Sequence, residues 1–540
     1  MTKVLTRRLP RAAALLVALT VALLTGAYAA FLAPSAGVSL SHGEAAEGVG
    51  LIADWFASDD PAHRVTESAW QRRDALPPLT GLVHGLAAWG LGGSVGDWQA
   101  VSLVNLLASM LSLVIVFLLL HRRLGWGPAL VGDLLLLLSP GFIEQMQGAG
   151  LEPLFGLGML LLVGAVYAAE RGPTGMLLAS LAFAALVGLH PSGVVLWIPL
   201  LVYVAVRRPS SASVAERGAF GLAPIPLYPF VGLALGLVLL WALWPWLDVQ
   251  IGKRAGEYFL TGYTGHHPDF AWMGKLYVQS ENSAPPFWAG LMLVVGRLPV
   301  PLLALATLGL ITALRRTRSA REPSTDVGTA DLLLPGLLVA TLVVVYGLSG
   351  TPFYDGNDGL RPVLPLLALV AGAGFASALR ALDHTGLPTR LATPVLAALV
   401  LVAAGVDRMG AGDSAQSYFN GLSGGRAAVA QGGTQLRPEA GIDGPTMDWL
   451  RHEAPADSSF AFAPQSQALN GLARTLQANG ALPTDRYVGK LHNTRFLIVP
   501  FLPEEPGYGP TLELVATEEP VHVIVRDGLP LVRIYDLGGL

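Results

Sequence analysis

Two glutamates three residues apart, Glu44 and Glu47, follow the first long apolar run of the chain. A carboxylate at a membrane surface is tolerated where it faces water and is destabilising where it faces lipid, so Glu44 is expected to face an aqueous cavity. On a helix the two side chains would share a face and could act on one ligand or one metal ion. Glu44 is therefore a candidate catalytic residue and Glu47 a candidate substrate-binding residue. The alternative is a solvated loop helix without chemistry of its own.

A third acid, Glu152, directly precedes Pro153 at the start of a later apolar run. Proline is favoured at the first position of a helix, and a carboxylate just before it can accept hydrogen bonds from the exposed amides. Glu152 is either such a cap or a second catalytic or metal-binding residue. Glu144 lies earlier in the same polar segment, so the two acids are expected on the same side of the membrane.

Cations interleaved with aromatic residues occupy the segment 248–282. Ammonium and guanidinium groups neutralise a phosphate, and flat rings cover the apolar faces of a sugar, although the same residue types also anchor proteins at membrane interfaces. Further on, Arg361 would bind an anion through two hydrogen bonds if buried, and would pair with Asp355 or Asp358 if exposed. The candidate binding residues of these two segments are Lys253, Arg254, His266, His267, Lys275, Tyr354 and Arg361.

The composition indicates an integral membrane protein. Of the 540 residues, 52% are hydrophobic and 13% charged, and the mean hydropathy is +0.53, which is too apolar for a soluble protein. The net charge of -4 and the scattered basic clusters argue against nucleic-acid binding. The absence of cysteine excludes disulfides, thiolate metal sites and cysteine nucleophiles.

Lys and Arg concentrate on the cytoplasmic side of membrane spans, so the basic end of each apolar run predicts its orientation. The basic run ends include Arg123, Arg171, Arg208, Arg318 and Arg380. About eleven crossings follow, beginning with an uncleaved span at 12–33, with a cytoplasmic N-terminus and an outer C-terminus. Two shorter runs that begin with Pro-Pro, 77–91 and 285–298, are expected to lie on the outer surface or to be re-entrant. All the candidate acids and cations then lie on the outer face.

The predicted fold class is an all-α polytopic plasma-membrane (inner-membrane) protein with a small extracytoplasmic α/β domain at the C-terminus. Residues 1–406 form the transmembrane domain, 407–443 a linker rich in Gly, Ala and Ser, and 444–540 the α/β domain. In the last, TMDWLRHEA is typical of a helix, and SFAFAP and RFLIVPF are typical of strands. VHVIVRDGLPLVRIYDL predicts two strands about an Asp-Gly turn.

Segments within 11–380 resemble bacterial GT-C glycosyltransferases, of the protein mannosyltransferase and aminoarabinose transferase branch (family 39-like). The segments are HGEAAEGVGLIAD, DALPPLTGLVHGLAAWG, LLLLLSPGFIEQMQGAGLEPLFGLGMLL and GLHPSGVVLWIPLL. The resemblance implies a catalytic base in the first outer loop, where Glu44 stands at the family's Asp position and Ala45 replaces the Glu that follows it. It also implies that Glu152 is the second-loop acid and that Arg361 is the basic residue near the donor phosphate.

The reaction implied by this resemblance moves a sugar from a polyprenyl-phosphate donor to a hydroxyl of a protein, lipid or glycan acceptor, with inversion. It needs no nucleotide, and a divalent cation is the one cofactor that such a site could use. A lipid-linked glycan ligase or polymerase is one alternative, and a transporter is another. The loss of the acidic pair at Ala45 adds a third, a catalytically inactive relative that acts as a scaffold.

Overall fold

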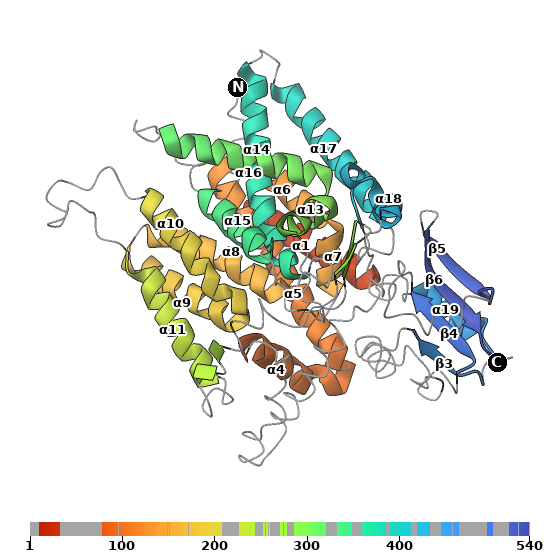
Figure 1. The fold of residues 1–540 in the computed structure, drawn as a ribbon. Coiled ribbons are helices and arrows are strands. Elements are labelled where there is room, and N and C mark those ends of the chain that lie inside the picture. The colour runs from red at the N-terminus through yellow and green to blue at the C-terminus, as the bar shows by residue number, and fades with distance from the viewer. Residues whose placement is uncertain are drawn as a thin grey trace, which may run out of the picture.

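The computed structural model describes a helical body and a C-terminal sheet beside it (Figure 1). The described residues are 10–32, 78–95, 97–147, 150, 152–170, 172–207, 226–243, 252–253, 255–256, 259, 270–273, 275–277, 286–319, 332–347, 358–384, 389–411, 418–432, 444–455, 457–463, 486, 494–500, 518–526 and 529–538.

The helices of the body begin close to the places where the apolar runs of the sequence begin. In the first half they are α1 (Arg11–Leu32), α4 (Pro78–Val95), α5 (Asp97–Leu124), α6 (Trp126–Leu137), α7 (Pro140–Gln147), α8 (Glu152–Ala169), α9 (Pro173–Leu189), η2 (Pro191–Leu196), α10 (Trp197–Arg207) and α11 (Tyr228–Leu243). In the second half they are α13 (Phe287–Arg297), α14 (Val300–Ser319), α15 (Leu333–Gly347), η7 (Asp358–Val363), α16 (Leu364–His384) and α17 (Thr389–Ala411). A short hairpin, β1 (Phe270–Trp272) with β2 (Lys275–Tyr277), lies between the halves.

The number of membrane crossings is only partly supported. By length and composition, four described helices could cross a membrane, or five if α6 and α7 are one bent span. The other predicted crossings correspond to six shorter apolar helices. The chain is therefore a multi-pass membrane protein, whereas the count of eleven and the orientation of its ends stay predictions.

The chain bends sharply between α6 and α7, by 71°. Pro140 at the start of α7 has no amide hydrogen for the helix ladder, so a continuous helix through this point is disfavoured. The segment that was expected to be an outer loop therefore folds back as a second short helix. Phe142 and Ile143 of this helix are buried in the core of the body.

Helix α16 lies at the centre of the body, and residues 364–375 in its first half are all buried. It packs against α14 through glycines. A Cβ added at Gly374 would collide with the carbonyl oxygen of Leu305, and one added at Gly309 would collide with that of Val370. Small residues allow this close approach of two helix backbones, the usual packing solution within membranes.

The C-terminal region forms a four-stranded sheet with one helix, as the sequence predicts. Helix α19 (Gly444–His452) precedes β3 (Phe460–Phe462), β4 (Phe496–Pro500), β5 (His522–Arg526) and β6 (Leu529–Asp536), in the sheet order β3-β4-β6-β5. Trp449 of α19 packs edge-on against Phe496, which joins the helix to the sheet. Leu529 and Leu531 belong to the main hydrophobic cluster of the helical body, so the sheet also contacts that body.

Part of the predicted linker has its own structure. Residues 418–432 form η9 (Gly421–Ser423) and α18 (Gly425–Gln431). Asn420 caps η9, because its side chain accepts hydrogen bonds from the amides of Leu422 and Ser423. The domain boundaries at 407 and 444 stay predictions.

Candidate functional site

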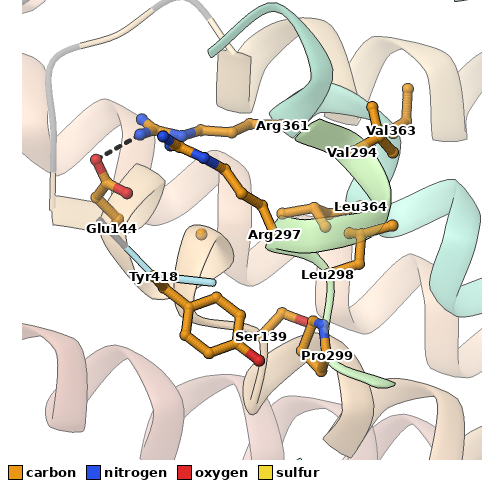
Figure 2. A pocket seen from close by; sticks show the side chains of 11 residues that line it. Ser139, Glu144, Val294, Arg297, Leu298, Pro299, Arg361, Val363, Leu364 and Tyr418 are labelled. Carbon is orange, nitrogen blue, oxygen red and sulfur yellow. Dashed lines mark hydrogen bonds and ion pairs between the residues drawn. The ribbon is translucent and has the colours of Figure 1, made fainter. Parts of the chain in front are cut away.

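One cavity lies where α13 ends and where α14 and α16 begin. Its lining residues are Ser139, Gly141, Glu144, Val294, Arg297, Leu298, Pro299, Arg361, Val363, Leu364 and Tyr418 (Figure 2). They come from α7 and the residue before it, α13, the two residues between α13 and α14, η7 with α16, and the segment after α17. The charge pattern of the sequence predicts that all these chain ends lie on one side of the membrane, and in the structure they meet at the cavity.

An ion pair between Glu144 and Arg361 crosses this cavity. Nη2 of Arg361 donates to Oε1 of Glu144 at 2.5 Å, and the two side chains are only 5% and 8% exposed. Arg361 is held at the junction of η7 and α16, where Val363 and Leu364 are buried in the main core. The sequence left two possibilities for Arg361: a buried side chain that binds an anion, or an exposed one that pairs with Asp355 or Asp358. The structure shows burial, with Glu144 as the anion.

A second arginine, Arg297, lies beside this pair. Figure 2 shows its side chain extending from α13 toward the same end of the cavity as Arg361. The guanidinium carbon of Arg297 lies 4.9 Å from the ring centroid of Phe419, a cation–π contact. The charged residues in the described part of the lining are thus two arginines and one glutamate, a formal charge of +1. This part of the lining is suited to an anion.

Tyr418 supplies a phenol to the cavity wall and is buried. Burial first, and the negative charge of Asp407 second, raise the pKa of Tyr418 above its ordinary range. The hydroxyl therefore stays protonated and can act as a hydrogen-bond donor. Asp407 also accepts a hydrogen bond from the amide of Val300 at 3.0 Å, which caps the start of α14.

The cavity has a volume of about 30 Å³, which is room for one or two water molecules. A sugar phosphate does not fit this space. Glu144 already occupies the guanidinium of Arg361, so another oxyanion that binds Arg361 at the same place has to displace this carboxylate.

Glu152 lies close to this region but is not one of the lining residues. It begins α8, is half-buried, and its carboxylate folds back over Gly150. One turn later, Gly156 packs on η7, where an added Cβ would lie 3.1 Å from the carbonyl oxygen of Pro362. The start of α8 is thereby fixed next to the helix that carries Arg361.

A buried polar pair supports the loop before Glu152. Asn105 of α5 donates to the carbonyl oxygen of Gly150 at 2.9 Å, and its own side-chain oxygen lies 3.1 Å from Nε2 of His84. Since that oxygen can only accept, Nε2 of His84 carries the proton. Burial lowers the pKa of His84 to about 4, against the smaller effect of the bond to Asn105, so the imidazole is neutral.

Of the other predicted site residues, the structure describes Glu152, Lys253 and Lys275, and none of these three lines the cavity. Lys253 and Lys275 are exposed. The remaining candidates lie outside the described residues: Glu44, Glu47, Arg254, His266, His267 and Tyr354. Within the described ranges no three His, Asp or Glu side chains are grouped to hold a metal ion. A divalent cation therefore stays a prediction, and it would depend on the residues outside those ranges.

Sequence reasoning missed Arg297, Tyr418 and the pairing role of Glu144. Arg297 could have been noticed in the sequence, because it lies at the predicted outer end of a span, whereas Lys and Arg usually lie at the cytoplasmic ends. Glu144 was visible only as an acid in a polar segment. Nothing local in the sequence marks Tyr418, which reaches the cavity through the fold of a segment expected to be a linker.

Comparison with solved structures identifies the fold. The chain is similar to ArnT from Cupriavidus metallidurans bound to undecaprenyl phosphate, with 17% identity, a TM-score of 0.50, and coverage of 97% of this chain and 98% of that one. It is also similar to an oligosaccharyltransferase from Archaeoglobus fulgidus, with 11% identity, a TM-score of 0.48, and coverage of 90% and 69%. No protein-family model matches the chain, and no curated protein matches it.

The resemblance drawn from the loop motifs is therefore confirmed at the level of the fold: almost the whole chain follows the fold of ArnT.

Proposed function

We propose that this chain is a membrane glycosyltransferase of the GT-C type. It moves a sugar from a polyprenyl-phosphate donor to an acceptor hydroxyl on the extracytoplasmic side of the membrane. The observation that carries the proposal is the buried Arg361, which lines a cavity with Arg297 and is paired there with a carboxylate. A guanidinium that already holds one oxyanion in a nearly dry site is suited to hold a phosphate in the same place. The fold likeness to ArnT, solved with undecaprenyl phosphate bound, supports a lipid-linked phosphate.

The proposed reaction is a single displacement at the anomeric carbon. The acceptor oxygen attacks from the face opposite the phosphate, and its proton passes to Glu44 as the general base. The bond between the anomeric carbon and the phosphate oxygen breaks, and its electron pair stays on the phosphate. Configuration is inverted because one displacement occurs.

Arg361 acts where charge develops. The donor is a phosphodiester with one negative charge, and the leaving group is a phosphomonoester with a charge of about -1.5 to -2. A cation fixed beside the phosphate oxygen that separates from the anomeric carbon binds the transition state more strongly than the donor. This difference in binding is the condition for catalysis.

The proposal is tested by donor consumption in proteoliposomes. A panel of radiolabelled polyprenyl-phosphate sugars is offered to the wild type, Glu44→Gln and Arg361→Gln. Arg380→Gln is the matched control. Arg380 lies near the C-terminal end of α16, whereas the N-terminal end of this helix lines the cavity. We expect loss of turnover in the first two variants and near-normal turnover in the control. No turnover with any donor, or full activity of Arg361→Gln, would refute the proposal.

A further inference from the structure

The segment after α17 contributes to the cavity more than its linker-like composition suggests. Tyr418 lines the cavity, Phe419 lies against Arg297, and Asn420 is 99% buried, at 1% exposure. These three consecutive residues form what we call the clamp. They contact the end of α13, from which more than a hundred residues separate them in the sequence. Tertiary folding therefore determines their position.

Asn420 holds the C-terminal turn of α13. Its side-chain nitrogen donates to the carbonyl oxygens of Val295 at 2.6 Å and Leu298 at 2.7 Å, and its backbone amide donates to that of Gly296 at 2.7 Å. The last carbonyls of a helix have no donors within that helix. The clamp supplies three donors to the turn that carries Arg297.

The close approach of the clamp depends on a glycine. A Cβ added at Gly296 would lie 3.1 Å from the ring of Phe419, which is tighter than ordinary contact. Phe419 can therefore lie close against the helix and present its ring to the guanidinium of Arg297. The cation–π contact restricts the arginine side chain to the part of space that faces the cavity.

We propose that Arg297 is a second phosphate-binding residue and that the clamp positions it. The inference rests on the proposed function, because the anion is taken to be a polyprenyl phosphate. Among the described lining residues, two guanidinium groups and one carboxylate carry a net charge of +1. A monoester phosphate that displaces Glu144 from Arg361 and also reaches Arg297 matches the charge of the two arginines better than a single carboxylate does. Arg297 therefore acts most strongly on the leaving group after the sugar bond has broken.

The test measures binding of a polyprenyl monophosphate to the purified full-length chain in nanodiscs, without turnover. Its comparison ligand is the polyprenyl alcohol of the same length, which has the lipid tail without the phosphate. For Arg297→Gln we expect a loss of monophosphate affinity of roughly 10- to 100-fold and unchanged affinity for the alcohol. Arg297→Lys should restore part of the loss, because it restores charge without the planar fork.

The positioning role of the clamp is tested with Asn420→Asp. A carboxylate still accepts from Leu422 and Ser423 but cannot donate to Val295 and Leu298, so the cap of η9 is retained while two of the three hydrogen bonds to the end of α13 are lost. We expect weaker monophosphate binding in Asn420→Asp, and little further loss when it is combined with Arg297→Gln. Additive losses would mean that Asn420 does not act through Arg297.

Three outcomes overturn the inference. Wild-type affinity in Arg297→Gln would do so while leaving the proposed function intact, provided that Arg361→Gln still binds weakly. An equal loss of alcohol affinity would show that Arg297 is only structural. If the wild type prefers the alcohol to the monophosphate, both the inference and the proposed function fail.

Discussion

The Glu144–Arg361 pair predicts an asymmetric pattern of stabilities. Both side chains are at least nine-tenths buried, so removal of one partner leaves the other without its closest counter-charge. Breaking such a pair costs about 3–5 kcal/mol. Glu144→Leu leaves two arginines together and should show the full loss. Arg361→Met should show a smaller one, because Arg297 in the same cavity still offsets the charge of Glu144.

The double variant Glu144→Leu/Arg361→Met should recover most of this stability, to within about 1 kcal/mol of the wild type, since apolar pairs often replace buried ion pairs without loss. At about 2.1 cal/mol/K of unfolding entropy per residue, the loss in Glu144→Leu lowers the apparent Tm by about 3–4 °C for 540 residues. The assay is thermal unfolding in detergent at one fixed scan rate, because membrane proteins often unfold irreversibly.

The same variants separate stability from function. The double variant should be stable and yet unable to bind a polyprenyl monophosphate tightly, because it retains only one of the two arginines. Single variants with the Tm of the wild type, or losses that simply add in the double variant, would refute the buried pair as a source of stability.

Three further predictions concern residues away from the cavity. Gly374→Ala should lower the apparent Tm strongly because the added methyl group meets the backbone of α14, whereas Gly405→Ala, which has nothing within 4 Å, is the matched control and should not. Both carboxylate oxygens of Asp133 lack a hydrogen-bond partner among the described residues, so Asp133→Leu should raise the Tm by removing an unsatisfied buried group. Because the pKa of His84 is about 4 when folded and about 6.5 when unfolded, the unfolded chain binds more protons between these values, and stability should fall by up to about 3 kcal/mol as pH drops from 6.5 to 4. Thermal unfolding across this pH range checks the last point, and His84→Gln should remove that part of the slope.

The helices and strands were largely predictable because their signals are local. Apolar runs with basic residues at their ends predicted most helices of the body, and the Asp-Gly turn predicted β5 and β6. The bend before α7 was not predicted, since Ser139 and Pro140 were compatible with a simple loop. The sheet order was also beyond the sequence, because the pairing of β4 with β6 depends on packing between distant segments.

Of the residues that line the cavity, only Arg361 was predicted from the sequence as a binding residue. Arg361 stood out because a cation at the outer end of a span needs an anion. Its actual partner, Glu144, comes from the first third of the chain, and no periodicity links the two. Arg297 acquires its position from Asn420, whose hydrogen bonds depend on the folded path after α17. Such contacts are products of tertiary structure.

The separation of Glu144 and Arg361 by 217 positions has a consequence for biosynthesis. A ribosome adds about 5–20 residues per second, so Glu144 enters the membrane region roughly 10–40 s before Arg361 exists. Arg297 is made earlier than Arg361 and is the first of the two arginines that Glu144 can meet. The pair that closes the cavity can therefore form only in the last part of synthesis, after most of the helical body has been made.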